Sequence, residues 1–167
     1  MTFDPGILIW AIPIGLGAAL IMDCFGYVLR FAFGWQGPRF SPVGRWILHM
    51  PSGVFAHNTI ADASPKQGEM IVGWSVHFLT AIGYALVLLV FGGSNWLAQP
   101  DIILALLVGW GTIVMPFCVM YPSLGFGLAM SKTPEPWTAR RKTLINHTVF
   151  GLGMWVMAMV TSAILPP

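Results

Sequence analysis

Four long apolar segments, separated by polar stretches, dominate the pattern of this chain. They cover residues 7–29, 70–91, 102–121 and 143–165. Each segment holds about 20 residues, and a helix of that length crosses a bilayer about 30 Å thick. We therefore predict an all-α protein, an integral membrane four-helix bundle, with a single membrane domain over residues 1–167.

The composition agrees with a protein solvated by lipid. Charged residues make up 8% of the chain, against about 25% in soluble domains, and apolar residues make up 56%. We expect no nucleic-acid partner, because the net charge is only +2 and the basic residues form no soluble basic face. Cys24 and Cys118 both lie in apolar segments, so we expect no disulfide framework.

The basic residues predict the orientation in the membrane. All eight lysines and arginines lie in or beside two polar loops, residues 30–69 and 122–142. The opposite side holds Asp4 and Asp101 and no basic residue. Because lysine and arginine favour the cytoplasmic side, we predict two cytoplasmic loops and an N-out/C-out topology.

A short amphipathic segment lies in the first polar loop, around residues 42–50. Ser41 and Pro42 are typical of a helix start, and Pro51 stops the helix. One face of this helix would be apolar, with Val43, Trp46, Ile47 and Met50. We predict a cytoplasmic interfacial helix that lies along the membrane surface.

Three ionisable residues fall inside the apolar segments. Asp23 and His77 would each lie about 10 Å from the cytoplasmic end of their helices, and His147 about 6 Å from it. Such residues usually face a protein interior or a wet cavity. We predict a polar pocket open to the cytoplasm and covered by the first loop, with these ligand-binding residues: Asp23, Arg45, His49, His57, His77 and His147.

Several ligands would suit these residues. Asp23, His77 and His147 form a donor set for a metal ion such as zinc, iron or manganese. Haem between His77 and His147 is an alternative, for which Gly73 and Gly151, one helical turn away, would make room. Soft ligands for copper are also present: Met22, Cys24, Cys118 and Met120.

Other functions remain open at this stage. Asp23 and His77 could relay protons in a transporter with a flexing point at Pro116, which would require a homo-oligomer. The basic residues Arg140–Lys142 could bind an anionic headgroup, although the topology alone explains them. In a structural bundle without a ligand, the polar residues would only join helices. No G-x-S-x-G motif occurs, and the sequence leaves any enzymatic activity and its catalytic residues unknown.

A set of short motifs follows a fixed order along most of the chain. After Asp23 come Gly44-Arg45-Trp46, His49-Met50-Pro51, Gly53, Phe55, His57, Gly73-Trp74, His77, Pro116, Met120, Pro122, Gly125, Gly127, Ala129, Ser131, Pro134, His147 and Phe150-Gly151. This order resembles a bacterial family of small membrane proteins, domain-of-unknown-function family 2938, over about residues 15–153. The resemblance implies a multi-pass protein of the bacterial inner membrane, and it implies no activity, cofactor or functional residue.

Overall fold

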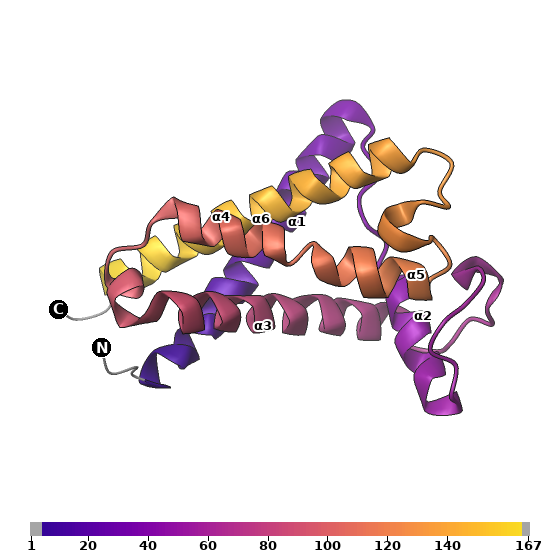
Figure 1. The fold of residues 1–167 in the computed structure, drawn as a ribbon, viewed down its shortest axis with the longest axis horizontal. Coiled ribbons are helices and arrows are strands. Elements are labelled where there is room, and N and C mark those ends of the chain that lie inside the picture. The colour runs from indigo at the N-terminus through magenta and orange to yellow at the C-terminus, as the bar shows by residue number, and fades with distance from the viewer. Residues whose placement is uncertain (1–4, 165–167) are drawn as a thin grey trace. The chain divides into compact units, whose positions relative to one another are not determined.

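The computed structural model describes residues 5–164, which form helices and turns without a β-strand in that range (Figure 1). Asp4 and residue 165, the predicted end of the fourth segment, lie outside the described residues. Four helical stretches are long and apolar enough to cross a membrane: Pro5–Phe33, Glu69–Ala98, Ile102–Ser123 and Pro136–Ile164. The predicted all-α class with four membrane-capable helices is therefore confirmed.

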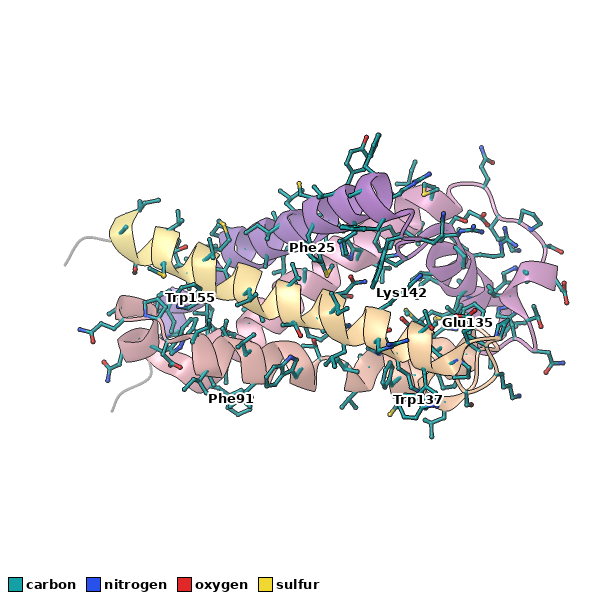
Figure 2. All side chains as sticks on the ribbon, turned by 90° about the horizontal axis from the view of Figure 1, so that it is seen from above. Phe25, Phe91, Glu135, Trp137, Lys142 and Trp155 are labelled. Carbon is teal, nitrogen blue, oxygen red and sulfur yellow. The ribbon has the colours of Figure 1, made fainter. Side chains whose placement is uncertain are left out.

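Large apolar side chains cover the outside of these stretches. Phe91 and Trp137, for example, extend away from the ribbon (Figure 2) and are about three-quarters exposed. Water would solvate such a surface poorly, whereas lipid chains would solvate it well. The exposed surface therefore agrees with a bilayer as the surroundings of the helices.

The helix ends differ from the predicted segment ends for local reasons. Helix α1, Ala11–Phe33, follows the 3-10 helix η1, Pro5–Trp10, and ends at Gly34, which adopts a left-handed conformation. Helix α3, Glu69–Ala98, continues past the predicted end at residue 91 and is kinked at Gly93 (φ 65°). Helix α6, Pro136–Ile164, begins seven residues early, because its first turns are polar and hydropathy marks only the lipid-compatible part.

The third stretch is interrupted near Pro116, as the sequence predicts. Helix α4, Ile102–Gly111, ends before a π-helix, η4, Pro116–Met120, and the short helix α5, Tyr121–Ser123. Proline lacks the N–H group that would bond to the carbonyl four residues earlier. The break at Thr112 is therefore a direct result of proline at position 116.

The remaining elements are short and lie in the two polar loops. They are α2, Ser41–His49; the 3-10 helices η2, Met50–Ser52, and η3, Ile60–Asp62; and η5, Leu128–Met130. The chain divides into two compact units. The helix unit comprises residues 5–36, 78–112 and 146–164 of the described range, and the loop unit comprises Gly37–His77 and Ile113–Ile145. The prediction of a single membrane domain stays a prediction.

Small residues bring the helices of the helix unit together. A methyl group on Gly15 of α1 would lie only 2.6 Å from Ala81 O of α3. One on Gly109 of α4 would lie 2.8 Å from the Gly151 Cα atom of α6. In membranes such close packing is a main source of helix association. Glycine at positions 15 and 109 therefore allows these helices to approach closely.

The loop unit has an apolar core of its own. Val43 and Trp46 of α2 are buried with Ile60 and Leu124. The helix predicted around residues 42–50 is thus present, but its most apolar face packs against protein. Whether α2 also touches the membrane surface stays a prediction.

Candidate functional site

The two polar loops are joined through their backbones within the loop unit. His57 N donates to Ser123 O at 2.8 Å, and Ile60 N donates to Leu124 O at 3.1 Å. Gly125 follows directly, and any side chain there would collide with the Asn58 carbonyl. The first and second polar loops therefore fold as one body, although about 65 residues of chain separate the paired positions.

An ion pair between Arg45 and Glu69 ties α2 to the start of α3. Arg45 Nε lies 2.8 Å from Glu69 Oε2, and Nη2 lies 2.9 Å from Oε1, so the pair has the two-point geometry favoured by arginine and carboxylate. The hydrogen bond to Glu69 raises the pKa of the Arg45 guanidinium above its usual value. Both side chains are mostly buried, which strengthens the interaction relative to an exposed pair.

Arg45 also holds the chain between these helices. Its Nη1 donates to Ile60 O at 3.3 Å and to Ala63 O at 3.1 Å. Of the five N–H groups of a guanidinium, most are therefore directed to Glu69 and two backbone carbonyls. Arg45 is thus a structural residue of the loop unit, and its predicted role as a ligand-binding residue gains no support.

Two glycines allow α3 to pack closely against α2 and against Phe40, the residue before α2. A Cβ atom on Gly44 would collide with the Glu69 carbonyl, and one on Gly73 would collide with the Phe40 carbonyl. The ring of His77 lies against Phe40, with ring centres 4.4 Å apart. The space predicted for a flat macrocycle at Gly73 is therefore filled by the chain itself.

The space beside Gly151, the corresponding glycine on α6, is also occupied by protein. A methyl group on Gly151 would meet Ala105 O of α4 at 3.0 Å. Neither glycine of the haem hypothesis provides room for a cofactor. Haem ligation by His77 and His147 consequently loses the observation on which it depended.

His49 and His57 meet at the two ends of the segment 50–56. Their ring centres are 5.2 Å apart, and the rings are nearly perpendicular, at 82°. His49 Nε2 lies 3.0 Å from Ser64 O. Because a carbonyl only accepts, Nε2 of His49 carries the proton, and Nδ1 is the acceptor nitrogen of the neutral ring.

The other ring has an unsatisfied nitrogen. Nε2 of His57 is buried and has no hydrogen-bond partner within the described part of the chain. Buried polar atoms are nearly always paired, so each exception requires a physical explanation such as an ordered water, an ion or a ligand. The His49–His57 pair is therefore the candidate ligand-binding site of the loop unit.

His147 lies in the helix unit, bonded to Thr112. Thr112 Oγ1 donates to Gly109 O at 2.6 Å, and it lies 2.7 Å from His147 Nδ1. Since the single hydroxyl proton points to the carbonyl, His147 Nδ1–H must be the donor to Thr112. The network thus assigns the tautomer of the neutral ring and leaves Nε2 of His147 as the acceptor nitrogen.

The structure divides the predicted site residues between the two units. Asp23 and His147 belong to the helix unit, whereas Arg45, His49, His57 and His77 belong to the loop unit. Within residues 5–164, no three His, Cys, Asp or Glu side chains are grouped so as to hold a metal ion. The metal prediction for Asp23, His77 and His147 thus gains no support, and Cys24 and Cys118 are free and exposed.

Sequence reasoning missed Glu69 and Thr112. Glu69 is the only acidic residue between Asp62 and Asp101, and it directly precedes an apolar segment. A single acidic residue at the start of an apolar segment needs a basic partner, and Arg45 in the preceding loop was available to form an ion pair with it. Thr112 offered a weaker signal, as the residue whose carbonyl is freed by Pro116.

Comparison with known proteins gives a family but no activity. A family model described as "Protein of unknown function (DUF2938)" matches residues 12–161. No curated protein and no solved structure gives a significant match. The matched range includes both loops and every predicted site residue. With nearly its whole length matched, the chain belongs to the DUF2938 family of proteins of unknown function.

Proposed function

We propose that this protein is a multi-pass protein of the bacterial inner membrane that binds a small ligand through its cytoplasmic loop unit. The imidazole rings of His49 and His57 would form the binding site. The observation that carries this proposal is the buried Nε2 atom of His57, which has no partner in the described part of the chain and belongs to a ring beside His49.

The cytoplasmic orientation is supported by charge. Seven of the eight lysines and arginines belong to the loop unit: Arg39, Arg45, Lys66, Lys132, Arg140, Arg141 and Lys142. The only one outside it, Arg30, is in the last turn of α1. By the positive-inside rule this unit would face the cytoplasm and both termini the periplasm.

The chemistry of the two rings limits the ligand. A neutral His49 offers Nδ1 as an acceptor, because its Nε2 donates to Ser64 O. His57 offers Nε2, which can donate or accept according to its tautomer. A small solute with hydrogen-bonding groups, or a metal ion completed by water, would satisfy both nitrogens. Asp23, His77 and His147 stay predicted residues of the polar pocket.

A transporter is the second candidate. Its support is the π-helix Pro116–Met120 in the third membrane-capable stretch, because π-helical turns often occur at functional sites. Such a protein would act as a homo-oligomer. A flux assay in proteoliposomes, with Pro116→Ala as the variant, would test it separately.

The ligand proposal is tested on protein purified into nanodiscs without chelators. Native mass spectrometry and elemental analysis would be run on wild type and on His49→Ala, His57→Ala and His147→Ala. We expect a bound solute or metal in wild type and its loss in the first two variants only. His147→Ala is the matched control, since it removes the same side chain from the helix unit.

Two other results would contradict the proposal. Loss in His147→Ala and Asp23→Asn, with retention in His57→Ala, would move the site to the polar residues of the helix unit. No bound species in wild type would leave the structural bundle as the better interpretation. Orientation is tested independently by fusions, with alkaline phosphatase active after the C-terminus and a fluorescent protein active in the second loop.

A further inference from the structure

The segment between the two histidines presents apolar side chains outward. Outside the four membrane-capable stretches, the exposed large apolar residues of the described range are Val54, Phe55 and Leu128. Val54 is 38% exposed and Phe55 is 62% exposed. Adjacent exposed apolar side chains can serve as a contact with a membrane or a partner.

This loop is held in place by its backbone. The buried Trp46 indole N–H donates to Phe55 O at 2.8 Å, and Gly53 N donates to Met50 O at 2.8 Å. The rings of His49 and His57 meet across its base. Phe55 is therefore exposed because the loop directs it outward, while its backbone is bonded to the core of the unit.

The net charge of the loop unit favours an anionic surface. Residues 24–61 include Arg30, Arg39 and Arg45 and no acidic residue, and residues 50–56 carry no charge at all. Glu69 is already neutralised by Arg45. The loop unit as a whole has more basic than acidic residues, because its only acidic residues are Asp62, Glu69 and Glu135. Exposed apolar side chains in a unit with an excess of basic residues match the interface of a bilayer with anionic lipids.

We propose that Val54 and Phe55 insert into the headgroup region of an anionic bilayer, in the leaflet that the loop unit faces. The contact that the sequence predicts for the apolar face of α2 would thus be made by the loop that follows it. Val43 and Trp46 of α2 are buried in the core, so they are not available for lipid. This proposal is independent of any ligand at His49 and His57.

The test measures where a label at position 55 lies. Phe55→Cys is made in a Cys24→Ser/Cys118→Ser background and spin-labelled in nanodiscs of phosphatidylcholine with phosphatidylglycerol. Collisions with oxygen, which is concentrated in lipid, are compared with collisions with a water-soluble nickel complex. Gln67→Cys, an exposed loop residue, is the aqueous reference, and Leu79→Cys, 67% exposed on α3, is the lipid reference.

We expect the label at position 55 to resemble that at Leu79, with nickel accessibility several-fold below that at Gln67. Nickel accessibility equal to that at Gln67 would place the loop in water and overturn the proposal. Low accessibility to both reagents would mean that protein covers the loop, which would also overturn it. An unchanged depth in pure phosphatidylcholine would overturn the role of anionic lipid.

A second variant keeps the result interpretable. Trp46→Phe removes the indole N–H that bonds to Phe55 O and retains an aromatic ring in the core. If the loop is positioned as described, the label should become more mobile and its depth less uniform in this variant. An unchanged spectrum would contradict the positioning role of Trp46.

Discussion

Arg45 and Glu69 are 24 residues apart in sequence, yet they form a two-point ion pair with contacts of 2.8 and 2.9 Å. The same guanidinium bonds to the carbonyls of Ile60 and Ala63. One side chain thus joins α2, the loop after it and the start of α3. The ion pair and these two hydrogen bonds therefore hold three segments of the loop unit together.

The stability effects of the two partners of this ion pair should be coupled. We expect Arg45→Met and Glu69→Gln each to cost roughly 2–3 kcal/mol, because the other charge stays mostly buried without its partner. The double variant should lose less than the sum of the two. Thermal unfolding followed by tryptophan fluorescence measures this, with exposed Arg39→Met as control; additive losses would contradict the coupling.

The sequence predicted the long helices well because their signal is local. Twenty apolar residues must be shielded from water wherever they occur, so length and composition were sufficient. The ends were less accurate. The predicted start at Thr143 followed hydropathy, whereas Pro136 already begins the helix and Arg140 to Lys142 lie within it. Nothing in hydropathy distinguishes a polar helical turn from a polar loop.

Gly73 offers a direct test of close packing in the loop unit. A methyl group there would collide with the Phe40 carbonyl, and this backbone atom cannot move without shifting the chain before α2. We expect Gly73→Ala to cost about 3 kcal/mol or to prevent accumulation of folded protein. Gly83→Ala on the same helix meets nothing within 4 Å.

The control should therefore change stability in the opposite direction. Replacing glycine by alanine in an open helical position stabilises by about 0.5–1 kcal/mol. Melting temperatures and expression yields of the two variants would be compared side by side. A tolerated alanine at position 73 would refute the filled space there and would restore room beside His77.

Ala129 carries backbone strain that a substitution can relieve. It adopts a left-handed conformation with φ 46° and ψ 41°, and its carbonyl accepts from Arg140 Nε at 2.8 Å. This conformation costs an alanine about 1–2 kcal/mol. Glycine would avoid that cost, but it would offset part of the gain because it raises the conformational entropy of the unfolded chain. We expect Ala129→Gly to stabilise the protein by about 0.5–1 kcal/mol.

The matched control is the same substitution in a regular helix. Ala139→Gly in α6 should destabilise by about 1 kcal/mol, since glycine is a poor helix former. The two variants therefore differ in sign, which thermal unfolding can detect. A loss of stability in Ala129→Gly would mean that the conformational entropy lost by glycine on folding outweighs the strain that it relieves in this turn.

The candidate site was harder to predict than the fold, because it depends on pairs distant in sequence. Arg45 was predicted to bind a ligand, but Glu69 and two carbonyls take up its donors. Gly73 was expected to leave space beside His77, and helical periodicity correctly puts the two residues on one face of α3. Periodicity carries no information on Phe40, which fills that space. Only His49 and His57 emerge both as predicted residues and as a contact with an unsatisfied nitrogen.

Thr112 and His147 allow the hydrogen-bond assignment itself to be tested. Thr112 Oγ1 donates to Gly109 O, so the ring must donate from Nδ1, and 15N NMR of labelled histidine should find the neutral ring protonated there. Thr112→Val removes the hydroxyl at nearly constant volume. We expect it to destabilise the protein by about 1–2 kcal/mol, because it removes the hydroxyl oxygen that accepts from a partly buried imidazole N–H.

Thr112→Ser separates the hydroxyl from the side-chain shape. It retains the Oγ atom, so the NMR signature of an Nδ1-protonated His147 should persist although a methyl group is lost. In Thr112→Val the signature should weaken, because the ring loses the hydroxyl oxygen as an acceptor and keeps only the Gly109 backbone near it. An unchanged tautomer in Thr112→Val would show that another acceptor fixes His147, and the network assigned to this helix unit would have to be revised.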